Sequence, residues 1–300
     1  MGKMCGAEPA GAGTAFDAAG AGAEDGFLPM EGEHMSPGGS TVSRAPAPRA
    51  SAPRASATRD GVLAFMVLAA ALAGIGVLAH PGPAVLAVSV LLGLAVLGAV
   101  VRSTVRRRGE PYGPADRVTV TRSVLVAVAT ALLPVGLAPA LETEAARPVA
   151  AWCWTLVAVA LPAWMLDGLD GLVARATGTA TRAGARLDQE VDAALLAVLC
   201  VAVAARLGLP GAWWVLLIGA LRYLFLLGGR IRPAWRRPLR FSAYRRTVAG
   251  IQGAVLLGAL APLVPWGLAG TATAAALGLL LVSFGRDVAT LEQAGPGLGR

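Results

Sequence analysis

The stretch MLDGLDGLVARATGTATRAGARLDQEVD, residues 165–192, places four aspartates between two apolar segments. The segment before it reads PVAAWCWTLVAVALPAWML and the one after it reads AALLAVLCVAVAA. A charged side chain at the centre of a bilayer costs roughly 2.5–3.5 kcal/mol on insertion scales. The four carboxylates, Asp167, Asp170, Asp188 and Asp192, therefore need either a position at the water interface or cations that neutralise them.

The composition of the whole chain is typical of a membrane protein. Of its 300 residues, 56% are hydrophobic and 15% are charged, with a mean hydropathy of +0.64. Soluble domains are about 45–50% apolar and about 25% charged. Several runs of about 18–20 residues, the length that crosses a bilayer as a helix, are almost free of charge. Because these runs are continuous rather than alternating, we predict helices instead of a β-barrel.

Eight membrane spans are predicted, and the basic residues orient them. The spans are 61–79, 83–101, 120–140, 148–166, 189–206, 210–229, 248–266 and 269–285. Arginines gather in the N-terminal tail, the C-terminus and the loops 102–122, 167–188 and 230–246. Since basic loops stay on the cytoplasmic side, the aspartates and both termini are expected to face the cytoplasm, at the plasma membrane. The net charge of +8 thus indicates topology and contact with anionic lipids, not nucleic acid.

Four parts are predicted along the chain. Residues 1–60 are rich in Gly, Ala, Pro and Ser and are expected to form a disordered cytoplasmic tail. Residues 61–101 hold two transmembrane helices without any polar cluster, for which packing is the expected role. Residues 102–290 form the domain that contains the aspartates, and residues 291–300 form a short C-terminal tail.

The spacing of the aspartates favours a shared site. Asp167 and Asp170 are three residues apart and Asp188 and Asp192 are four apart, so each pair lies on one face of a helix. Helical continuations of the flanking spans would bring the two faces together. Four close carboxylates repel unless they are protonated or bridged by cations, and Mg²⁺ or Mn²⁺ suits their oxygen ligands. From spacing alone, a solvated acidic loop and an ion or proton pathway in a transporter stay open.

Two glycines and an arginine indicate a phosphate ligand. Gly171 lies in the predicted helix, where glycine costs about 1 kcal/mol, and it lets a ligand approach the backbone. Gly184, one turn before Asp188, can serve the same purpose. Arg175 can pair with the acids or bind a phosphate. Acids that bind divalent ions, together with these residues, suit a substrate with a pyrophosphate.

The same residues resemble the signature of the CDP-alcohol phosphatidyltransferases, D-x2-D-G-x2-A-R-x8-G-x3-D-x3-D. Every fixed position is matched between Asp167 and Asp192, and the resemblance extends over roughly residues 112–290. It implies an all-α integral membrane protein with the six-helix catalytic core of that family, plus two extra N-terminal transmembrane helices. The Ala-, Gly- and Arg-rich composition resembles that of a bacterial, actinobacterial-like member.

The resemblance implies that a phosphatidyl group passes from CDP-diacylglycerol to an alcohol acceptor, with release of CMP, in phospholipid biosynthesis. All four aspartates would bind Mg²⁺ or Mn²⁺, as two ions, and Asp192 would also act as the general base. The residues implied to contact the CDP moiety are Gly171, Arg175, Thr181, Gly184 and Thr119.

Thr119 belongs to the segment ADRVTVTR, which resembles the family's N-x2-T-x2-R entry segment, with Asp116 in place of the asparagine. Arg122 is a second candidate from this segment. An interfacial cap and a positive-inside anchor are the alternative roles for Thr119 and Arg122.

Arg222 lies inside a predicted span, which marks it as a functional candidate unless its side chain snorkels to the interface. With Arg230 or Arg245 it is expected to bind a phosphorylated acceptor such as glycerol 3-phosphate or inositol phosphate. The family also implies a homodimer surrounded by membrane lipids. Two alternative functions remain: an intramembrane prenyltransferase acting on a pyrophosphate, and a non-catalytic ion-binding or transporter-like protein.

Overall fold

The computed structural model describes residues 52–106, 112–142, 149–177, 181–232, 235 and 243–293. All of them belong to Pro48–Arg300, one of two units into which the chain divides. Within these residues the regular structure is entirely helical, and six helices are long and apolar enough to cross a membrane. The protein is therefore an all-α, multi-pass integral membrane protein, as predicted.

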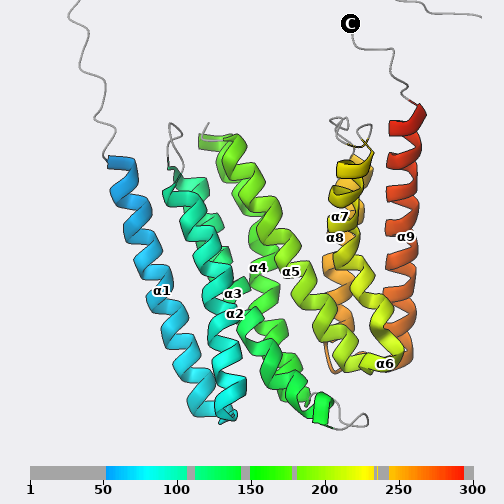
Figure 1. Ribbon diagram of the computed structural model, residues 1–300, viewed down its shortest axis with the longest axis horizontal. Coiled ribbons are helices and arrows are strands. Elements are labelled where there is room, and N and C mark those ends of the chain that lie inside the picture. The colour runs from blue at the N-terminus through cyan, green and yellow to red at the C-terminus, as the bar shows by residue number, and fades with distance from the viewer. Residues whose placement is uncertain are drawn as a thin grey trace, which may run out of the picture. The chain divides into compact units, whose positions relative to one another are not determined.

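The described helices are α1 (Ala52–Ala79), α2 (Pro83–Val105), α3 (Pro114–Glu142), α4 (Ala150–Thr177), α5 (Arg182–Leu207), α6 (Leu209–Ala212), the 3-10 helix η1 (Trp213–Val215), α7 (Leu216–Ile231), α8 (Ala243–Leu260) and α9 (Trp266–Gln293). Successive long helices reverse direction, so that α1, α3, α5 and α8 descend in Figure 1 while α2, α4, α7 and α9 ascend. The start of α1 and the end of α9 consequently lie at the same end of the helices.

Most predicted spans lie within one helix, whereas the span 210–229 covers α6, η1 and most of α7. α5 and α8 do not qualify as membrane spans by themselves. α5 carries Asp188, Glu190, Asp192 and Arg206 within its apolar sequence. The apolar part of α8 is short, Thr247–Leu260, and the predicted span 248–266 is wrong at its end. Pro262 and Pro265 stop the helix there, because proline lacks the backbone donor that a helix interior needs.

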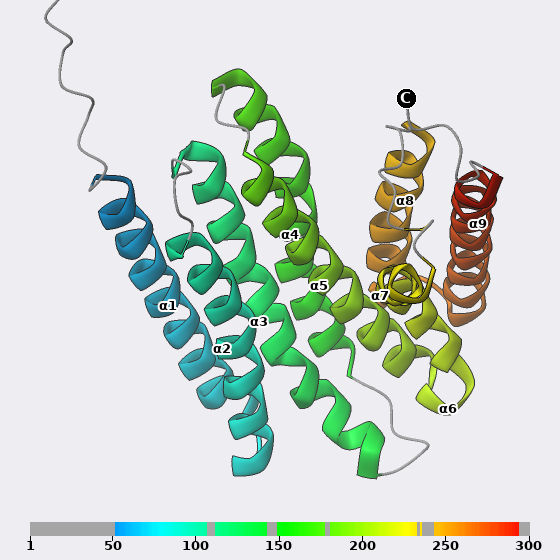
Figure 2. The ribbon, with the colours of Figure 1, turned by 45° about the horizontal axis from the view of Figure 1, so that its top comes forward.

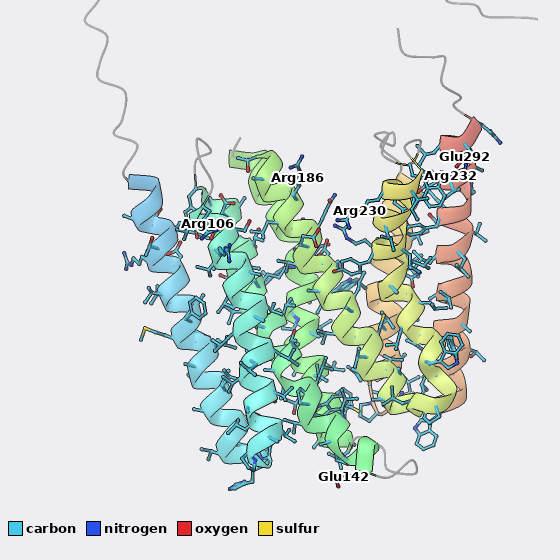
Figure 3. The ribbon with its side chains drawn as sticks, in the orientation of Figure 1. Arg106, Glu142, Arg186, Arg230, Arg232 and Glu292 are labelled. Atoms are coloured by element: carbon cyan, nitrogen blue, oxygen red, sulfur yellow. The ribbon has the colours of Figure 1, made fainter. Side chains whose placement is uncertain are left out.

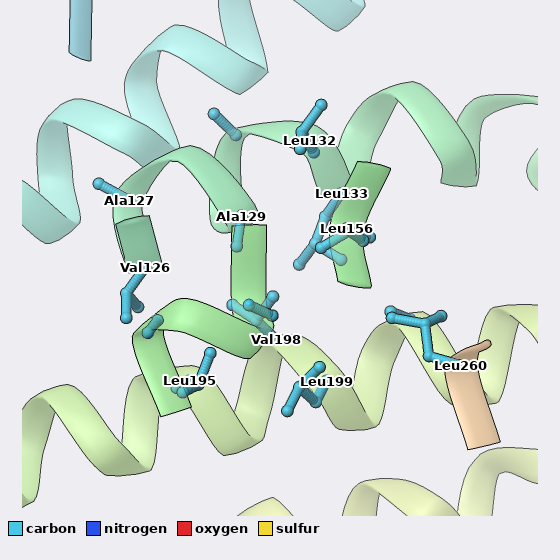
Figure 4. Close-up of a cluster of buried hydrophobic side chains, with 14 of the residues drawn as sticks. Val126, Ala127, Ala129, Leu132, Leu133, Leu156, Leu195, Val198, Leu199 and Leu260 are labelled. Atoms are coloured by element: carbon cyan, nitrogen blue, oxygen red, sulfur yellow. The ribbon is translucent and has the colours of Figure 1, made fainter. Parts of the chain in front are cut away.

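α3 and α5 are the central helices. In α3, 67% of the most apolar window is buried, against 22–28% in the other five candidate spans. α5 packs against α3, α4, α7 and α8. Figure 4 shows part of the resulting core, in which Leu195 and Leu199 of α5 lie near Ala129 of α3 and Leu156 of α4. Contacts with neighbouring helices replace contacts with lipid, which explains how α5 accommodates charged residues.

The far end of α5 is fixed by Arg206, which is buried. Its guanidinium donates hydrogen bonds to the carbonyl of Ala259 and, at 2.6 Å, to the carbonyl of Val264. These carbonyls lie at the end of α8 and in the turn before α9. Arg206 therefore joins α5 to the α8–α9 connection.

The two N-terminal helices pack against α3, beside one another in both views (Figure 1, Figure 2). α1 begins at Ala52, so the expectation of disorder up to residue 60 is wrong for residues 52–60. Alanines favour the helix here, and Asp60 accepts hydrogen bonds from Tyr112 at 2.9 Å and Arg117 at 3.0 Å. Residues 1–51 lie outside the described part, and α9 continues beyond residue 290 to Gln293.

α4 is held closely between α3 and α8 by two glycine–tryptophan contacts. A Cβ on Gly136 of α3 would lie 2.1 Å from the indole of Trp152, whose Nε1 donates to the Leu132 carbonyl at 2.7 Å. A Cβ on Gly253 of α8 would lie 2.3 Å from the indole nitrogen of Trp164. Only glycine lets these backbones come so near the indoles, so both contacts fix the position of the helix that carries Asp167.

Candidate active site

Two helices bring the acidic residues to one end of the protein. α4 continues to Thr177 and α5 starts at Arg182, so both extend beyond the predicted spans, as the spacing of the aspartates led us to expect. Asp167 lies toward the end of α4, and Asp188 and Asp192 lie in the first turns of α5. The antiparallel pairing of α4 and α5 thus places residues that are more than twenty positions apart in sequence beside one another.

Asp167, Asp188 and Asp192 form a compact acidic triad. One carboxylate oxygen from each lies within 4.8 Å of the others. The three side chains are half-buried, with 41%, 29% and 38% of their surfaces exposed. A divalent ion at about 2.1 Å from each ligand brings ligand oxygens to within roughly 4.2 Å of one another. Small movements of these carboxylates suffice for that, so the triad fits a hard divalent cation.

Arg122 of α3 lies among the three carboxylates. Its side chain is completely buried, and its Nη1 lies 3.0 Å from Oδ1 of Asp167 and 2.5 Å from Oδ1 of Asp188. Its Nη2 contacts Oδ1 of Asp192. A guanidinium offers five donors in a planar fork, which allows a single side chain to bind several carboxylates. Arg122 therefore connects α3 to both helices that carry the triad.

The charges within this group do not balance. Among the described residues, three carboxylates face one guanidinium, so negative charge is in excess. A partly buried group of like charges is unfavourable unless a cation offsets it. A divalent cation would offset this excess, which supports the fit of the triad to Mg²⁺ or Mn²⁺.

The sequence alone did not favour Arg122 over Thr119. In the described part of the chain, Arg122 contacts the acids and Thr119 does not. The Thr119 side chain is buried, and its hydroxyl donates to the Ala115 carbonyl of its own helix at 3.2 Å. A usable signal was present, because Arg122 lies inside the predicted span 120–140 just as Arg222 lies inside 210–229. The sequence left Arg122 open between a functional role and a positive-inside anchor, as it left Arg222 open between a functional role and snorkelling.

Thr181 and Gly184 cooperate at the start of α5. Thr181 is the N-cap residue, and its hydroxyl oxygen accepts a hydrogen bond from the Gly184 backbone N–H at 3.0 Å. This bond satisfies one of the orphan donors at a helix N-terminus. Both residues thus help to begin the helix that carries Asp188 and Asp192, and the hydroxyl proton of Thr181 can still be donated to a ligand.

The residues expected to bind the acceptor lie on α7 and α8. Arg222 donates from Nη2 to Oε1 of Glu190 at 2.9 Å, which joins α7 to α5. Arg230 is exposed in the last turn of α7 (Figure 3). Arg245 belongs to α8, but its side chain lies outside the described part. The described part shows no contact between the triad and Arg222. Its partner Glu190 lies on α5, between Asp188 and Asp192 in sequence.

Three further predicted residues, Asp170, Gly171 and Arg175, lie on α4. Their side-chain positions fall outside the described part of the chain. The convergence of Asp170 and Arg175 on the triad therefore stays a prediction.

Basic residues mark the end of the protein at which the triad lies. Arg106, Arg186, Arg230 and Arg232 lie toward the upper end in Figure 3, together with Glu292, and Glu142 lies at the lower end. A half-buried acidic triad among membrane helices defines an integral membrane protein with a polar site near one membrane surface.

The model of the CDP-alcohol phosphatidyltransferase family matches residues 114–282, more than half of the chain. The match begins at Pro114, the first residue of α3, and so excludes α1 and α2. No curated protein and no solved structure matches the chain significantly. The chain belongs to the CDP-alcohol phosphatidyltransferase family, whose members are transferases of phospholipid biosynthesis that use a CDP-alcohol and an alcohol acceptor and are typically metal-dependent.

Proposed function

We propose that the protein transfers a phosphatidyl group from CDP-diacylglycerol to an alcohol acceptor and releases CMP. The observation that carries this proposal is the convergence of Asp167, Asp188 and Asp192 at one end of the membrane helices of a CDP-alcohol phosphatidyltransferase. A site near the membrane surface suits a donor whose acyl chains stay in the bilayer while its nucleotide stays in water.

Asp167, Asp188 and Asp192, joined by Asp170, would hold Mg²⁺ or Mn²⁺ as two ions. When bound, the cations would offset the charge of the pyrophosphate and so stabilise the departing CMP. The triad geometry and its residual negative charge support this assignment.

Asp192 is the proposed general base. Its carboxylate takes the proton of the acceptor hydroxyl while the hydroxyl oxygen forms a bond to the phosphatidyl phosphorus. The bond from that phosphorus to the CMP oxygen breaks, and CMP leaves with the electron pair. Arg122 acts as a positioning residue, because its contacts with Asp188 and Asp192 orient both carboxylates of α5.

The proposed contacts with the CDP moiety come from both sides of the α4–α5 connection and from α3. Gly171 and Arg175 would contact the pyrophosphate from α4, and Thr181 and Gly184 from the start of α5. Thr119 would contribute from α3. The capped start of α5 supports this arrangement, since the N-terminus of a helix favours anions.

The site is proposed to face the cytoplasm at the plasma membrane, with both termini on the same side. The described basic residues at the triad end support this orientation through the positive-inside rule. The protein is further proposed to act as a homodimer, an expectation that comes from its family.

The acceptor is proposed to be phosphorylated, with Arg222 and Arg230 or Arg245 binding its phosphate. Because Arg222 pairs with Glu190, an acceptor phosphate would compete with that carboxylate for the guanidinium. Glycerol 3-phosphate and inositol phosphate both meet this requirement.

The deciding experiment measures CMP release by the purified protein from CDP-diacylglycerol and a panel of acceptors. CMP release that needs Mn²⁺ or Mg²⁺, is abolished by EDTA and is lost in Asp192→Asn would support the proposal. Pyrophosphate release from a prenyl donor, or cation transport into vesicles without CMP release, would replace it with one of the alternative functions.

A further inference from the structure

A cavity lies between α1 and α3, and its lining includes none of the acidic triad. Its volume is about 750 Å³, within the range of sites that hold small ligands. Its deep part is lined by the buried side chains of Ala64, Val120 and Val124, and the exposed side chains of Leu63 and Val67 also line it. The cavity is therefore apolar over most of its depth.

The residues of α3 that line this cavity lie on a different face from Arg122. Arg117, Val120, Thr121 and Val124 recur at helical spacing and face α1. Arg122 points instead toward α4 and α5, where it contacts the triad. The cavity and the triad thus lie on two sides of the same central helix.

α1 and α3 run in the same direction, since α2 returns the chain between them. The hydrogen bond from Arg117 on α3 to Asp60 on α1 joins residues that are 57 positions apart. In two parallel helices the same offset places residue 64 of α1 beside residue 121 of α3, and residue 67 beside residue 124. The polar residues of both helices consequently meet at one end of the cavity. From Ser56 to Val67 the lining extends roughly 16 Å along the helix axis, at about 1.5 Å per residue.

The polar end of the cavity carries a net positive charge. Arg59 and Arg117 both line it and are exposed, whereas Asp60 is the one acidic residue in its lining. Asp60 accepts from Nε of Arg117, and the guanidinium has further donors on its two terminal nitrogens. Ser56 also lies at this end of the lining, one turn before Arg59 and Asp60, whereas Thr121 lies one turn beyond Arg117, beside Ala64.

We propose that this cavity binds an anionic phospholipid of the surrounding leaflet. The lipid phosphate would lie between Arg59 and Arg117, and an acyl chain would follow Leu63 and Val67 into the bilayer. Basic residues at a membrane surface favour anionic headgroups, and a cavity with one charged end and one apolar end matches an amphiphile. Bound there, the lipid would join α1 to the helix that carries Arg122.

The proposal does not depend on catalysis and is tested by photolabelling. Full-length protein in nanodiscs is exposed to phosphatidylglycerol with a diazirine in its acyl chain, and labelled peptides are mapped by mass spectrometry. We expect labels in residues 55–67 and 117–125, displaced by unlabelled phosphatidylglycerol but not by phosphatidylcholine. Arg59→Gln should weaken labelling there roughly fivefold, the effect of a single basic residue at an anionic surface.

Two further variants make the test specific. Leu63→Trp fills the cavity from an exposed position and should abolish labelling of the two segments. Arg106→Gln removes an exposed arginine that does not line the cavity and should leave the labelling unchanged. Equal displacement by phosphatidylcholine, or equal losses in Arg59→Gln and Arg106→Gln, would overturn the proposal. Preferential displacement by CDP-diacylglycerol would also overturn it, by assigning the cavity to the donor.

Discussion

Nη1 of Arg122 on α3 and Oδ1 of Asp188 on α5 form an ion pair with a separation of 2.5 Å, and the arginine side chain in this pair is fully buried. The two residues are 66 positions apart in sequence and join the two central helices. Arg122 also contacts Asp167 and Asp192, so the arrangement of the acids depends on a residue outside the aspartate signature.

Arg122→Gln is expected to lower stability more without metal than with it. Removing one partner of a buried ion pair costs about 3–5 kcal/mol, and the lower end applies because the aspartates are partly exposed. A divalent cation can offset the repulsion that the substitution leaves among the carboxylates. Thermal unfolding of the solubilised protein in EDTA and in Mn²⁺ measures the difference. Equal destabilisation in both conditions would contradict the link between Arg122 and the cation site, and Arg106→Gln is the control.

Asp192→Asn and Asp167→Asn are expected to fail in different ways. An amide cannot accept the proton of the acceptor, so Asp192→Asn should reduce CMP release about 10²–10⁴-fold even at saturating Mn²⁺. Asp167→Asn should mainly raise the Mn²⁺ concentration that gives half-maximal activity. Asp287→Asn, an acid of α9 outside the triad, serves as the control. The base assignment fails if excess Mn²⁺ restores activity to Asp192→Asn.

Arg222→Ala and Glu190→Gln are expected to move acceptor affinity in opposite directions. Loss of Arg222 should raise the KM for a phosphorylated acceptor, because a cationic partner of its phosphate is gone. Glu190→Gln should lower that KM, since the carboxylate that pairs with Arg222 is removed. KM values for glycerol 3-phosphate and inositol phosphate, compared with their unphosphorylated alcohols, provide the measurement. An unchanged KM in Arg222→Ala excludes the residue from the acceptor site.

Gly136→Ala is expected to destabilise the contact between α3 and α4. The new Cβ would lie 2.1 Å from the Trp152 indole, and overpacking of this kind costs about 1–3 kcal/mol. Gly258→Ala is a matched control in α8, because nothing lies within 4 Å of a Cβ there. The control should be neutral or stabilising, since alanine is the better helix former by about 1 kcal/mol. Similar unfolding temperatures for the two variants would contradict the close approach.

Tyr112 is expected to make stability sensitive to alkaline pH. Burial, with further contributions from its hydrogen bond to Asp60 and the charge of that residue, raises the pKa of Tyr112. An unfolded tyrosine ionises near pH 10, whereas the folded residue keeps its proton to higher pH. Its contribution to stability is therefore complete below about pH 10 and is lost as the pH rises above that value. Unfolding measured across this range should show a shallower decline in Tyr112→Phe than in the wild type.

Much of the fold could be predicted from local sequence. Runs of apolar residues of membrane-spanning length mark six of the long helices. Pro262 and Pro265 explain the turn after residue 260, which the predicted span 248–266 did not include. The start of α1 at Ala52 was not predictable from apolarity, because residues 52–60 are polar and small and depend on Asp60 reaching Tyr112 and Arg117.

The candidate site also has features that local sequence predicts and features that it does not. The aspartate spacing predicts a shared cluster, and three of the four residues are found together. The partners Arg122–Asp188 and Arg222–Glu190 are 66 and 32 residues apart, so they follow from helix packing and not from any local pattern. Thr181 was expected to contact CDP. Its capping bond to Gly184 is a local feature, but the sequence Thr-x-x-Gly alone does not predict it.

The charged residues of α5 have a consequence for biogenesis. α5 carries Asp188, Glu190, Asp192 and Arg206. Its transfer from the translocon into lipid without partner helices is therefore unfavourable, because each charge within the hydrocarbon costs free energy. Arg122 on α3, which pairs with Asp188 and Asp192 in the first turns of α5, is already synthesised when α5 emerges. The carbonyls that receive Arg206 belong to residues 259 and 264, which emerge later. We therefore expect the triad end of α5 to find its partner as α5 enters the bilayer, and its other end to be fixed only after residues 259–264 have been translated.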